Sequence, residues 1–228
     1  MRIVERPTVL AGSRAPSDPH AIDDLSPMHL HGATGARIGP NTIIQLAHVL
    51  RDRYGEAAAG ALLFEGTGYA LNALPSAMVD EREAQAFVQT VMQAVGEQQG
   101  VQLLHEAGKR TADYLMAHRI PRPAQWVMKA LPKRAGVSIL LRAMQANAWT
   151  FAGSGTFSVL QRQKLVELSF HACAMCRDMT TALPACGFYA GTFEHLIRTI
   201  VAPPALVQEV ECMATGGHCC RFEVTGIH

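Results

Sequence analysis

Aromatic residues are scarce in this chain of 228 residues, at 6% of the composition, and neither sign of charge is in excess. The 20 Lys and Arg against 19 Asp and Glu give a formal net charge of +1. A general nucleic-acid-binding protein normally has a strong basic excess, or aromatic side chains on which bases stack. The composition therefore argues against a nucleic-acid partner.

The chain also lacks the glycine motif that holds the phosphates of a dinucleotide, because no Gly-x-Gly-x-x-Gly follows an expected strand. Gly66 and Gly68 come closest, but the third glycine is missing and the segment is expected to be helical. No Ser-His-Asp triad and no Walker loop are evident either. We therefore expect no nicotinamide or flavin to be bound through such a motif.

No apolar run is long enough to cross a membrane. The most apolar window, residues 61–79, is interrupted by Glu65, Asn72 and Pro75, whereas a spanning helix needs about 20 apolar residues. The N-terminal segment alternates charged and apolar residues, unlike a secretory signal peptide. We expect a cytoplasmic protein, peripheral at most to a membrane, in a compartment where thiols stay reduced.

Loop-forming residues separate an N-terminal arm from the rest of the chain. Residues 1–35 hold four prolines and three glycines, which predicts a poorly ordered arm. The length of the remainder, residues 36–228, is typical of a single domain.

Two hydrophobic periods follow one another within this domain. Apolar residues first recur with the period of a helix and later alternate with the period of a strand. The predicted helices cover residues 41–54, 56–72, 80–96, 98–118 and 124–131, with a helix or strand up to residue 144; the predicted strands cover residues 149–160, 164–171, 206–214 and 220–225. Because one helix, over 188–200, is inserted between the strands, we expect an α+β fold in which N-terminal helices pack on a C-terminal antiparallel sheet.

All six cysteines follow residue 170, and the spacing of three of them is typical of a metal site. Cys212 and Cys220 flank one glycine turn, so a tight hairpin brings them together, and Cys186 reaches them if the helix after it packs back on the sheet. With Glu209, three thiolates and one carboxylate would form a closed structural zinc site without a position for catalytic water. Glu209 and Cys212 lie an odd number of residues apart, so a bulge or twist is required if both are ligands.

Two alternatives to this zinc site stay open. Small buried apolar thiols without a metal are the ordinary role of cysteine in a core. The pair Cys173-Ala-Met-Cys176 could also enter the metal site in place of Cys186 or Glu209. The same pair could form a redox site, although the βαβ frame of a thioredoxin is missing.

The motifs of the C-terminal third resemble the V4R (4-vinyl reductase) domain. They are Cys186-Gly-Phe-Tyr-Ala-Gly and the run Glu209-x-x-Cys212-x-x-x-Gly-x-x-x-Cys220, and the helical segment over residues 104–108 fits the same pattern. The resemblance covers about residues 36–226 and is strongest to the bacteriochlorophyll-biosynthesis members of the family. It implies an α+β domain, frequently a homodimer, that encloses an apolar ligand pocket. It also implies that these three cysteines and Glu209 hold zinc.

The resemblance implies one of two activities on tetrapyrroles. The first is that of a carrier or accessory factor, which binds an intermediate of the Mg-protoporphyrin or protochlorophyllide type and serves the enzymes of the bacteriochlorophyll pathway. The second is that of an 8-vinyl reductase of divinyl protochlorophyllide with an external reductant. The family's name favours the enzyme, while the missing cofactor motif favours the accessory factor. A third interpretation is a small-molecule sensor that signals through a partner.

A tetrapyrrole site needs flat apolar walls, cations for the propionates and an axial ligand for magnesium. The candidates are Trp126, Met128, Met144 and Trp149 as walls, Lys129, Lys133, Arg134 and Arg142 as cations, and His105, His118 and His171 as axial ligands. Each class also has an ordinary structural role, as core, as a solvated basic face or as a structural histidine.

Overall fold

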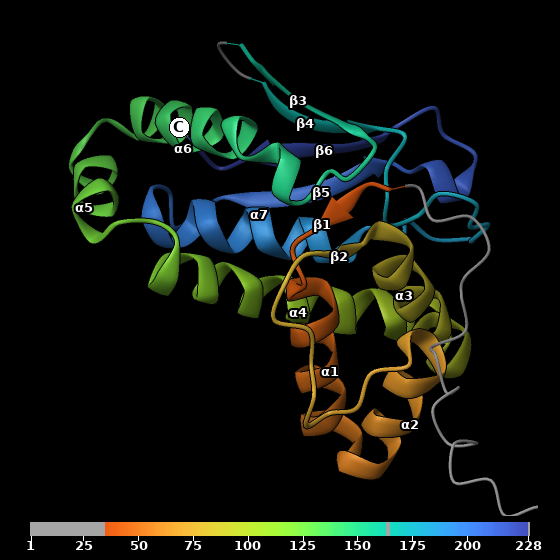
Figure 1. Ribbon diagram of the computed structural model, residues 1–228. Coiled ribbons are helices and arrows are strands. Elements are labelled where there is room, and N and C mark those ends of the chain that lie inside the picture. Colours follow the sequence, from red (N-terminus) through yellow and green to blue (C-terminus); the bar gives the residue numbers. More distant parts are fainter. Residues whose placement is uncertain (1–34, 163–164, 228) are drawn as a thin grey trace, which may run out of the picture.

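The computed structural model describes residues 35–162 and 165–227, and the predicted arm lies outside this part except for Gly35. Figure 1 shows helices in the first part of the chain and a sheet in the last part. The helices of the first part are α1 (Asn41–Tyr54), α2 (Glu56–Thr67), α3 (Glu81–Val95), α4 (Glu97–His118), α5 (Arg122–Ala130) and α6 (Lys133–Ala146). Helix α2 ends at Thr67, earlier than predicted, because Gly68 closes it with a left-handed φ of 76°.

Two short strands, β1 (Arg37–Ile38) and β2 (Val79–Asp80), pair antiparallel beside the helices. Strand β2 leads directly into α3, whose start is fixed by a capping box. The N–H of Arg82 donates to the Asp80 carboxylate at 2.9 Å, and the N–H of Asp80 donates to the Glu83 carboxylate at 3.3 Å. The first residue of α3, Glu81, is thereby held at a defined position.

The sheet of the last part has four antiparallel strands in the order β3-β4-β6-β5. Its strands are β3 (Thr156–Gln161), β4 (Val166–His171), β5 (Leu206–Glu211) and β6 (Cys220–Thr225); α7 (Gly187–Ile200) is inserted between β4 and β5, and the short turns η1 (Ala148–Thr150) and η2 (Met213–Thr215) precede β3 and β6. Alternate residues of β4 and β6 are buried, as expected of strands with one face on a core. The predicted α+β fold is therefore confirmed.

The core lies between three layers. Helix α7 covers one face of the sheet, α4 packs against the other side of α7, and α1 to α3 lie beyond α4 (Figure 1). Several of the scarce aromatic rings gather between the sheet and α7, where Phe170 stacks on Tyr189 with ring centroids 4.3 Å apart. These rings belong to Phe151, Phe157, Phe170, Tyr189, Phe193 and Phe222. None of the described helices is both long and apolar enough to cross a membrane.

Helices α4 and α7 approach each other unusually closely, because glycines line their contact. A Cβ atom at Gly191 would overlap the carbonyl oxygen of His105, and one at Gly108 would overlap the carbonyl oxygen of Phe188. The hydroxyl of Thr192 donates across the contact to the carbonyl of Gly108 at 3.2 Å. The backbones of the two helices are therefore in direct contact, which fixes the start of α7 relative to the helical layer.

Candidate metal centre

Two strands and one helix meet at one end of the sheet, and each brings a cysteine there. Cys186 directly precedes α7, Cys212 follows β5 and Cys220 begins β6, while Glu209 lies on β5. One ligand atom of each of these four residues lies within 4.8 Å of the others. The structure thus brings together the four residues that the sequence predicts as a metal site. We call these four the carboxylate set.

A β-bulge turns Glu209 and Cys212 toward the same site. Glu209 pairs with Phe222 and Glu211 pairs with Arg221, so one residue of β5 has no counterpart on β6. The extra residue reverses the parity of the side chains beyond it. The bulge that the odd spacing of the two residues requires is therefore present.

Cys173 and Cys176 also reach this site from the loop that follows β4. The ligand atoms of Cys173, Cys176, Cys186 and Cys220 likewise lie within 4.8 Å of one another, and we call this second group the four-thiol set. In this set Cys173 and Cys176 take the places of Glu209 and Cys212. The alternative from the sequence therefore agrees with the structure for Glu209 but not for Cys186, which belongs to both sets. All five thiols are buried.

The distances between the sulfur atoms fit the size of a zinc ion. The Sγ atom of Cys220 lies 3.5 Å from that of Cys186 and 3.9 Å from that of Cys212. It also lies 3.2 Å from that of Cys176, and the Sγ atoms of Cys173 and Cys186 are 3.7 Å apart. Two thiolates on one tetrahedral zinc are separated by about 3.8 Å, given a Zn–S bond of about 2.3 Å. Both sets are therefore compact enough for a metal without rearrangement of the backbone.

The Glu209 carboxylate favours the carboxylate set. Its Oε2 accepts a hydrogen bond from the backbone N–H of Cys186 at 2.9 Å, but its Oε1 is buried and has no hydrogen-bond partner in the described part of the chain. A buried oxygen without a partner costs about 1–3 kcal/mol. A cation among the thiols would remove that cost, so the residues present fit a metal.

Burial and the neighbouring groups raise the pKa of two candidate ligands and lower the pKa of the other two. Burial, with the nearby Cys212 thiol, raises the pKa of Glu209 to about 9. Hydrogen bonds with neighbouring thiols raise the pKa of Cys186 well above its ordinary value, and the bond with Cys173 contributes most. Hydrogen bonds with neighbouring thiols lower the pKa of Cys212 to about 6, and the bond with Cys176 contributes most. They also lower the pKa of Cys220 to about 6, where the bond with Cys173 contributes most. Without metal, Glu209 and Cys186 are therefore protonated at neutral pH.

Zinc binding is expected to release about two protons per ion at pH 7.5, one from Glu209 and one from Cys186, because the metal binds only the deprotonated groups. Protons compete with the metal as the pH falls, so the zinc affinity should fall as well, and more steeply below pH 6, where Cys212 and Cys220 also take up protons. A pH indicator in weakly buffered solution measures the release. Glu209→Gln should reduce it to about one proton, and an unchanged release would contradict the role of this carboxylate.

A buried ion pair anchors the loop that carries Cys173 and Cys176. Glu81 is only 1% exposed, and its carboxylate accepts from Nη1 of Arg177 at 3.1 Å and from the N–H of Ser154 at 2.7 Å. The guanidinium of Arg177 also donates to the carbonyl of Ala172, next to the first cysteine of the loop, at 2.9 Å. Sequence reasoning missed this anchor, because Glu81 and Arg177 are 96 residues apart and follow no shared pattern.

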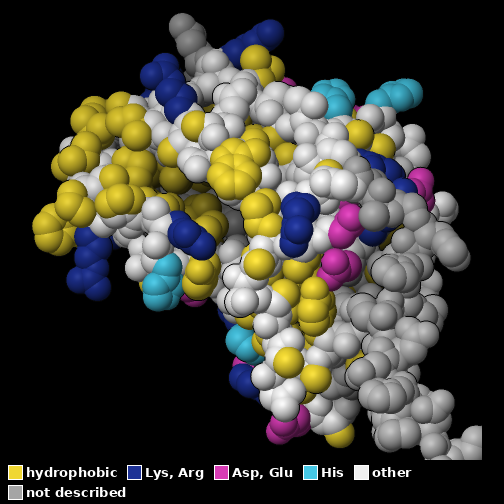
Figure 2. All heavy atoms as spheres, viewed as in Figure 1, with side chains coloured by type: hydrophobic (Ala, Val, Ile, Leu, Met, Phe, Trp, Pro, Cys, Tyr) yellow, Lys and Arg dark blue, Asp and Glu magenta, His cyan; other side chains and the backbone are white. Residues whose placement is uncertain are grey.

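The residues predicted to bind a tetrapyrrole lie in different surroundings. Met128 and Met144 are buried in the core, whereas Trp126 and Trp149 are 70% and 64% exposed. His118 and Arg142 are exposed as well, as are Lys129, Lys133, Arg134 and His171, and His105 is half-buried on α4. Figure 2 shows hydrophobic side chains gathered on the surface where Figure 1 places α5 and α6.

The two histidine candidates on α4 lie too far apart to act at one site. His105 and His118 lie 13 residues apart on α4, which corresponds to about 20 Å of helix, so they cannot share one magnesium ion. Burial lowers the pKa of His105, so its imidazole is neutral at pH 7. His118 lies at the end of α4, close to α5, because the side-chain amide of Gln125 donates to the carbonyls of Met116 and Ile120. The structure thus places His118, and not His105, near Trp126.

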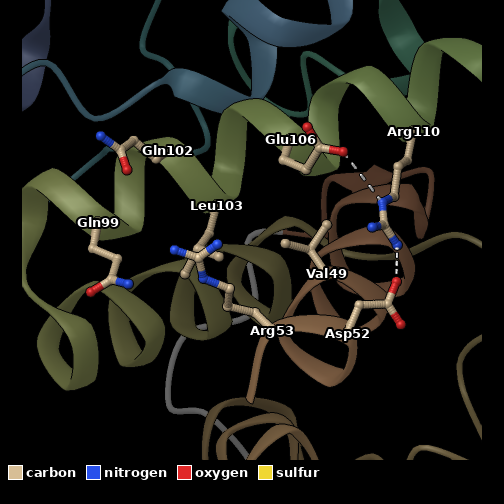
Figure 3. A pocket seen from close by; sticks show the side chains of 8 residues that line it. All are labelled: Val49, Asp52, Arg53, Gln99, Gln102, Leu103, Glu106 and Arg110. Atoms are coloured by element: carbon tan, nitrogen blue, oxygen red, sulfur yellow. Dashed lines mark hydrogen bonds and ion pairs between the residues drawn. The ribbon is translucent and has the colours of Figure 1, made fainter. Parts of the chain in front are cut away.

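A separate cleft of about 390 Å³ lies between α1 and α4 (Figure 3). Its side chains pair with each other, since Arg110 contacts Asp52 at 2.7 Å and Glu106 at 3.7 Å. The lining residues are Val49, Asp52, Arg53, Gln99, Gln102, Leu103, Glu106 and Arg110. None of the predicted tetrapyrrole ligands lines this cleft.

Known proteins are similar to this chain over most of its length. Residues 166–226 match the sequence profile of the V4R domain. The bacteriochlorophyll synthase 23 kDa chain of Cereibacter sphaeroides is 36% identical over 84% of this chain and 92% of its own length, and that of Rhodobacter capsulatus is 33% identical over 82% and 85%. The chain therefore belongs to the V4R family that includes these 23 kDa chains.

The fold is also similar to that of H-NOX proteins. A mutant H-NOX structure from T. tengcongensis superposes with a TM-score of 0.55 over 82% of this chain and 97% of its own. At 12% sequence identity this likeness concerns the fold alone.

Proposed function

We propose that this protein is an accessory factor of bacteriochlorophyll biosynthesis that binds a Mg-tetrapyrrole intermediate and contains a structural zinc ion. The observation that carries this proposal is the similarity to the two 23 kDa chains over most of both lengths. Because those chains are named as parts of bacteriochlorophyll synthase, this synthase is the proposed protein partner.

The zinc ion would be held by the carboxylate set. Three thiolates and one carboxylate fill a tetrahedral shell and leave no position for a reacting water, so the metal has a structural role. It would join the β5–β6 hairpin, through Glu209, Cys212 and Cys220, to the start of α7 at Cys186. The partnerless oxygen of Glu209 supports this set over the four-thiol set.

The proposed pigment site is the surface formed by the end of α4 with α5 and α6. Trp126 offers an exposed flat ring, Arg142 and Lys129 offer cations for the propionates, and His118 offers an axial ligand. One solved H-NOX structure, similar in fold with a TM-score of 0.54 and 14% identity, is named for its heme distortion. A tetrapyrrole in a related architecture is consistent with this proposal, although the likeness is one of fold.

Titration of the purified protein with Mg-protoporphyrin and with divinyl protochlorophyllide tests the proposal, with the absorbance of the pigment followed in the presence and absence of NADPH. A shifted spectrum that saturates at a fixed stoichiometry, with the vinyl group intact, is the expected result. Loss of the vinyl group would instead identify the 8-vinyl reductase. The absence of any binding would contradict both activities.

Replacing His118 with Ala is expected to weaken pigment binding about tenfold, which corresponds to ~1.4 kcal/mol, because the magnesium would lose its axial ligand. His105→Ala is the matched control, since this second histidine of α4 lies about 20 Å away along the helix. Absorbance titration of both variants measures the difference. If only His105→Ala weakened binding, the site would have to be moved to the middle of α4.

We propose further that residues 36–228 fold as one domain and that the protein is a homodimer, as the resemblance to V4R proteins implies. Analytical ultracentrifugation of the full chain tests the second point. A monomer at micromolar concentration would contradict it.

A further inference from the structure

The outer surface of the α5–α6 pair is apolar and exposed. Trp126 and Val127 of α5 are 70% and 57% exposed, and Ile139 of α6 is exposed as well. We define the α5–α6 face by its exposed residues Arg122, Trp126, Val127, Lys129, Ile139 and Arg142. Figure 2 shows hydrophobic side chains over these helices with Lys and Arg side chains around them. An exposed apolar surface of this kind marks a binding site.

Packing on the other side of α5 explains why these side chains point outward. Met128 is buried, and its carbonyl oxygen would lie 2.6 Å from a Cβ atom at Gly136 of α6, so the two helices are in close contact there. Helix α6 is held at the edge of the sheet, since the Ser138 hydroxyl donates to the Gln161 side chain at 2.8 Å. The inner side of the pair is therefore used by the fold.

The charge of this region is of one sign. Residues 114–166 contain eight of the 20 Lys and Arg of the chain and none of its 19 Asp and Glu. This segment therefore has a formal charge of +8 and the rest of the chain −7, against a total of +1. The near-neutral composition thus conceals a strongly cationic segment of the sequence, which includes the two helices with exposed hydrophobic residues, α5 and α6.

We propose that the α5–α6 face binds the surface of an anionic lipid bilayer. Helix α5, only nine residues long, is too short to span a bilayer but can lie in the interface with Trp126 and Val127 among the lipid chains. Indole rings favour this interface, and Lys129 and Arg142 would contact the phosphate groups of the lipids. The absence of any acidic residue over 53 positions complements a uniformly anionic surface better than it complements a protein of mixed charge. This binding requires neither pigment nor zinc. Because Trp126, Lys129 and Arg142 also belong to the proposed pigment site, the lipid surface and the pigment would compete for them.

The two tryptophans of the chain make the test direct. Trp149→Phe leaves Trp126 as the reporter, and its fluorescence is expected to shift to the blue when vesicles of phosphatidylcholine with phosphatidylglycerol are added to the full chain. The protein should float with these vesicles in a density gradient, should not float with vesicles of phosphatidylcholine alone, and should dissociate at high salt. Pigment is absent throughout, so failure of this experiment is distinct from failure of pigment binding.

Exposed substitutions separate the apolar from the electrostatic contribution. Trp126→Ser with Val127→Ser should weaken vesicle binding by at least about tenfold, whereas Phe64→Ser, at a residue 67% exposed on α2, should leave it unchanged. Lys129→Gln with Arg142→Gln should weaken it by about 25-fold, about fivefold per charge, and Arg53→Gln on α1 should not.

Three results would overturn the proposal. They are absence of flotation with anionic vesicles, equal loss in the matched controls, and a Trp126-dependent dimer whose fluorescence is already blue-shifted without lipid. The last result would assign the face to a second copy of the chain.

Discussion

Cys220→Ser is expected to abolish stoichiometric zinc binding and to lower the free energy of unfolding by at least about 3 kcal/mol. Cys220 belongs to both the carboxylate set and the four-thiol set, so neither arrangement can compensate for its loss. The free energy of zinc binding to structural sites, about 10–16 kcal/mol in small peptides, is largely folding free energy. Since a domain is stable by only about 5–15 kcal/mol, this loss removes a large share of its stability, and we expect a markedly lower unfolding temperature. Metal content and thermal unfolding followed by circular dichroism measure both effects.

Cys219→Ser is the matched control for this experiment. Cys219 is the preceding residue and is also buried, but its side chain lies near the carboxylate of Glu211, outside both ligand sets. The control should keep its zinc and its unfolding temperature. A Cys220→Ser protein that also kept both would show that the cluster is a core of unmetallated thiols.

Two further isosteric changes decide between the ligand sets. Cys212→Ser should release zinc if the carboxylate set is correct, and Cys176→Ser should retain it, because only the first residue belongs to that set. Both thiols are equally buried, so general damage to the core would affect both variants alike. The opposite outcome would assign the metal to the four-thiol set and would leave the Glu209 oxygen unexplained.

The part of the site that could be predicted from the sequence is the part whose geometry is local. Cys212 and Cys220 flank one turn, and the parity of Glu209 and Cys212 required the bulge that the structure contains. The approach of Cys176 to Cys220 depends instead on the pairing of β4 with β6, in which Phe170 lies opposite Cys220. Such a long-range register cannot be derived from the spacing of residues along the chain.

The predicted tetrapyrrole ligands show a second limit of sequence reasoning. Trp126 and Met128 are both apolar and only two residues apart, yet α5 places them on different sides, one exposed and one buried. On a helix of nine residues, periodicity alone did not show which side would face the core. The close contact with Gly136 of α6 determines this, and it is a tertiary contact.

Gly191→Ala is expected to destabilise the protein by about 3 kcal/mol or more, because the added methyl group would overlap the carbonyl oxygen of His105. Overpacking of a core typically costs about 1–3 kcal/mol when side chains can adjust, but here a backbone atom is in the way. Helix α7 cannot retreat, since the sheet lies on its other side (Figure 1). For a chain of this length the unfolding temperature should fall by roughly 6–12 °C. A shift of α7 would also move Cys186, so the zinc affinity should fall in the same variant.

Gly60→Ala should increase the free energy of unfolding, whereas Gly191→Ala should decrease it. Gly60→Ala is therefore the control for helix propensity. Gly60 lies within α2, where a Cβ atom would meet only the Leu71 side chain at 3.6 Å, an ordinary contact. Alanine stabilises the interior of a helix relative to glycine by about 0.5–1 kcal/mol, so Gly60→Ala should raise the unfolding temperature slightly. Chemical denaturation of both variants, with zinc in excess, measures the two free energies. If Gly191→Ala were as well tolerated as Gly60→Ala, α4 and α7 could not be in direct backbone contact, and the placement of Cys186 beside Cys220 would lose its structural basis.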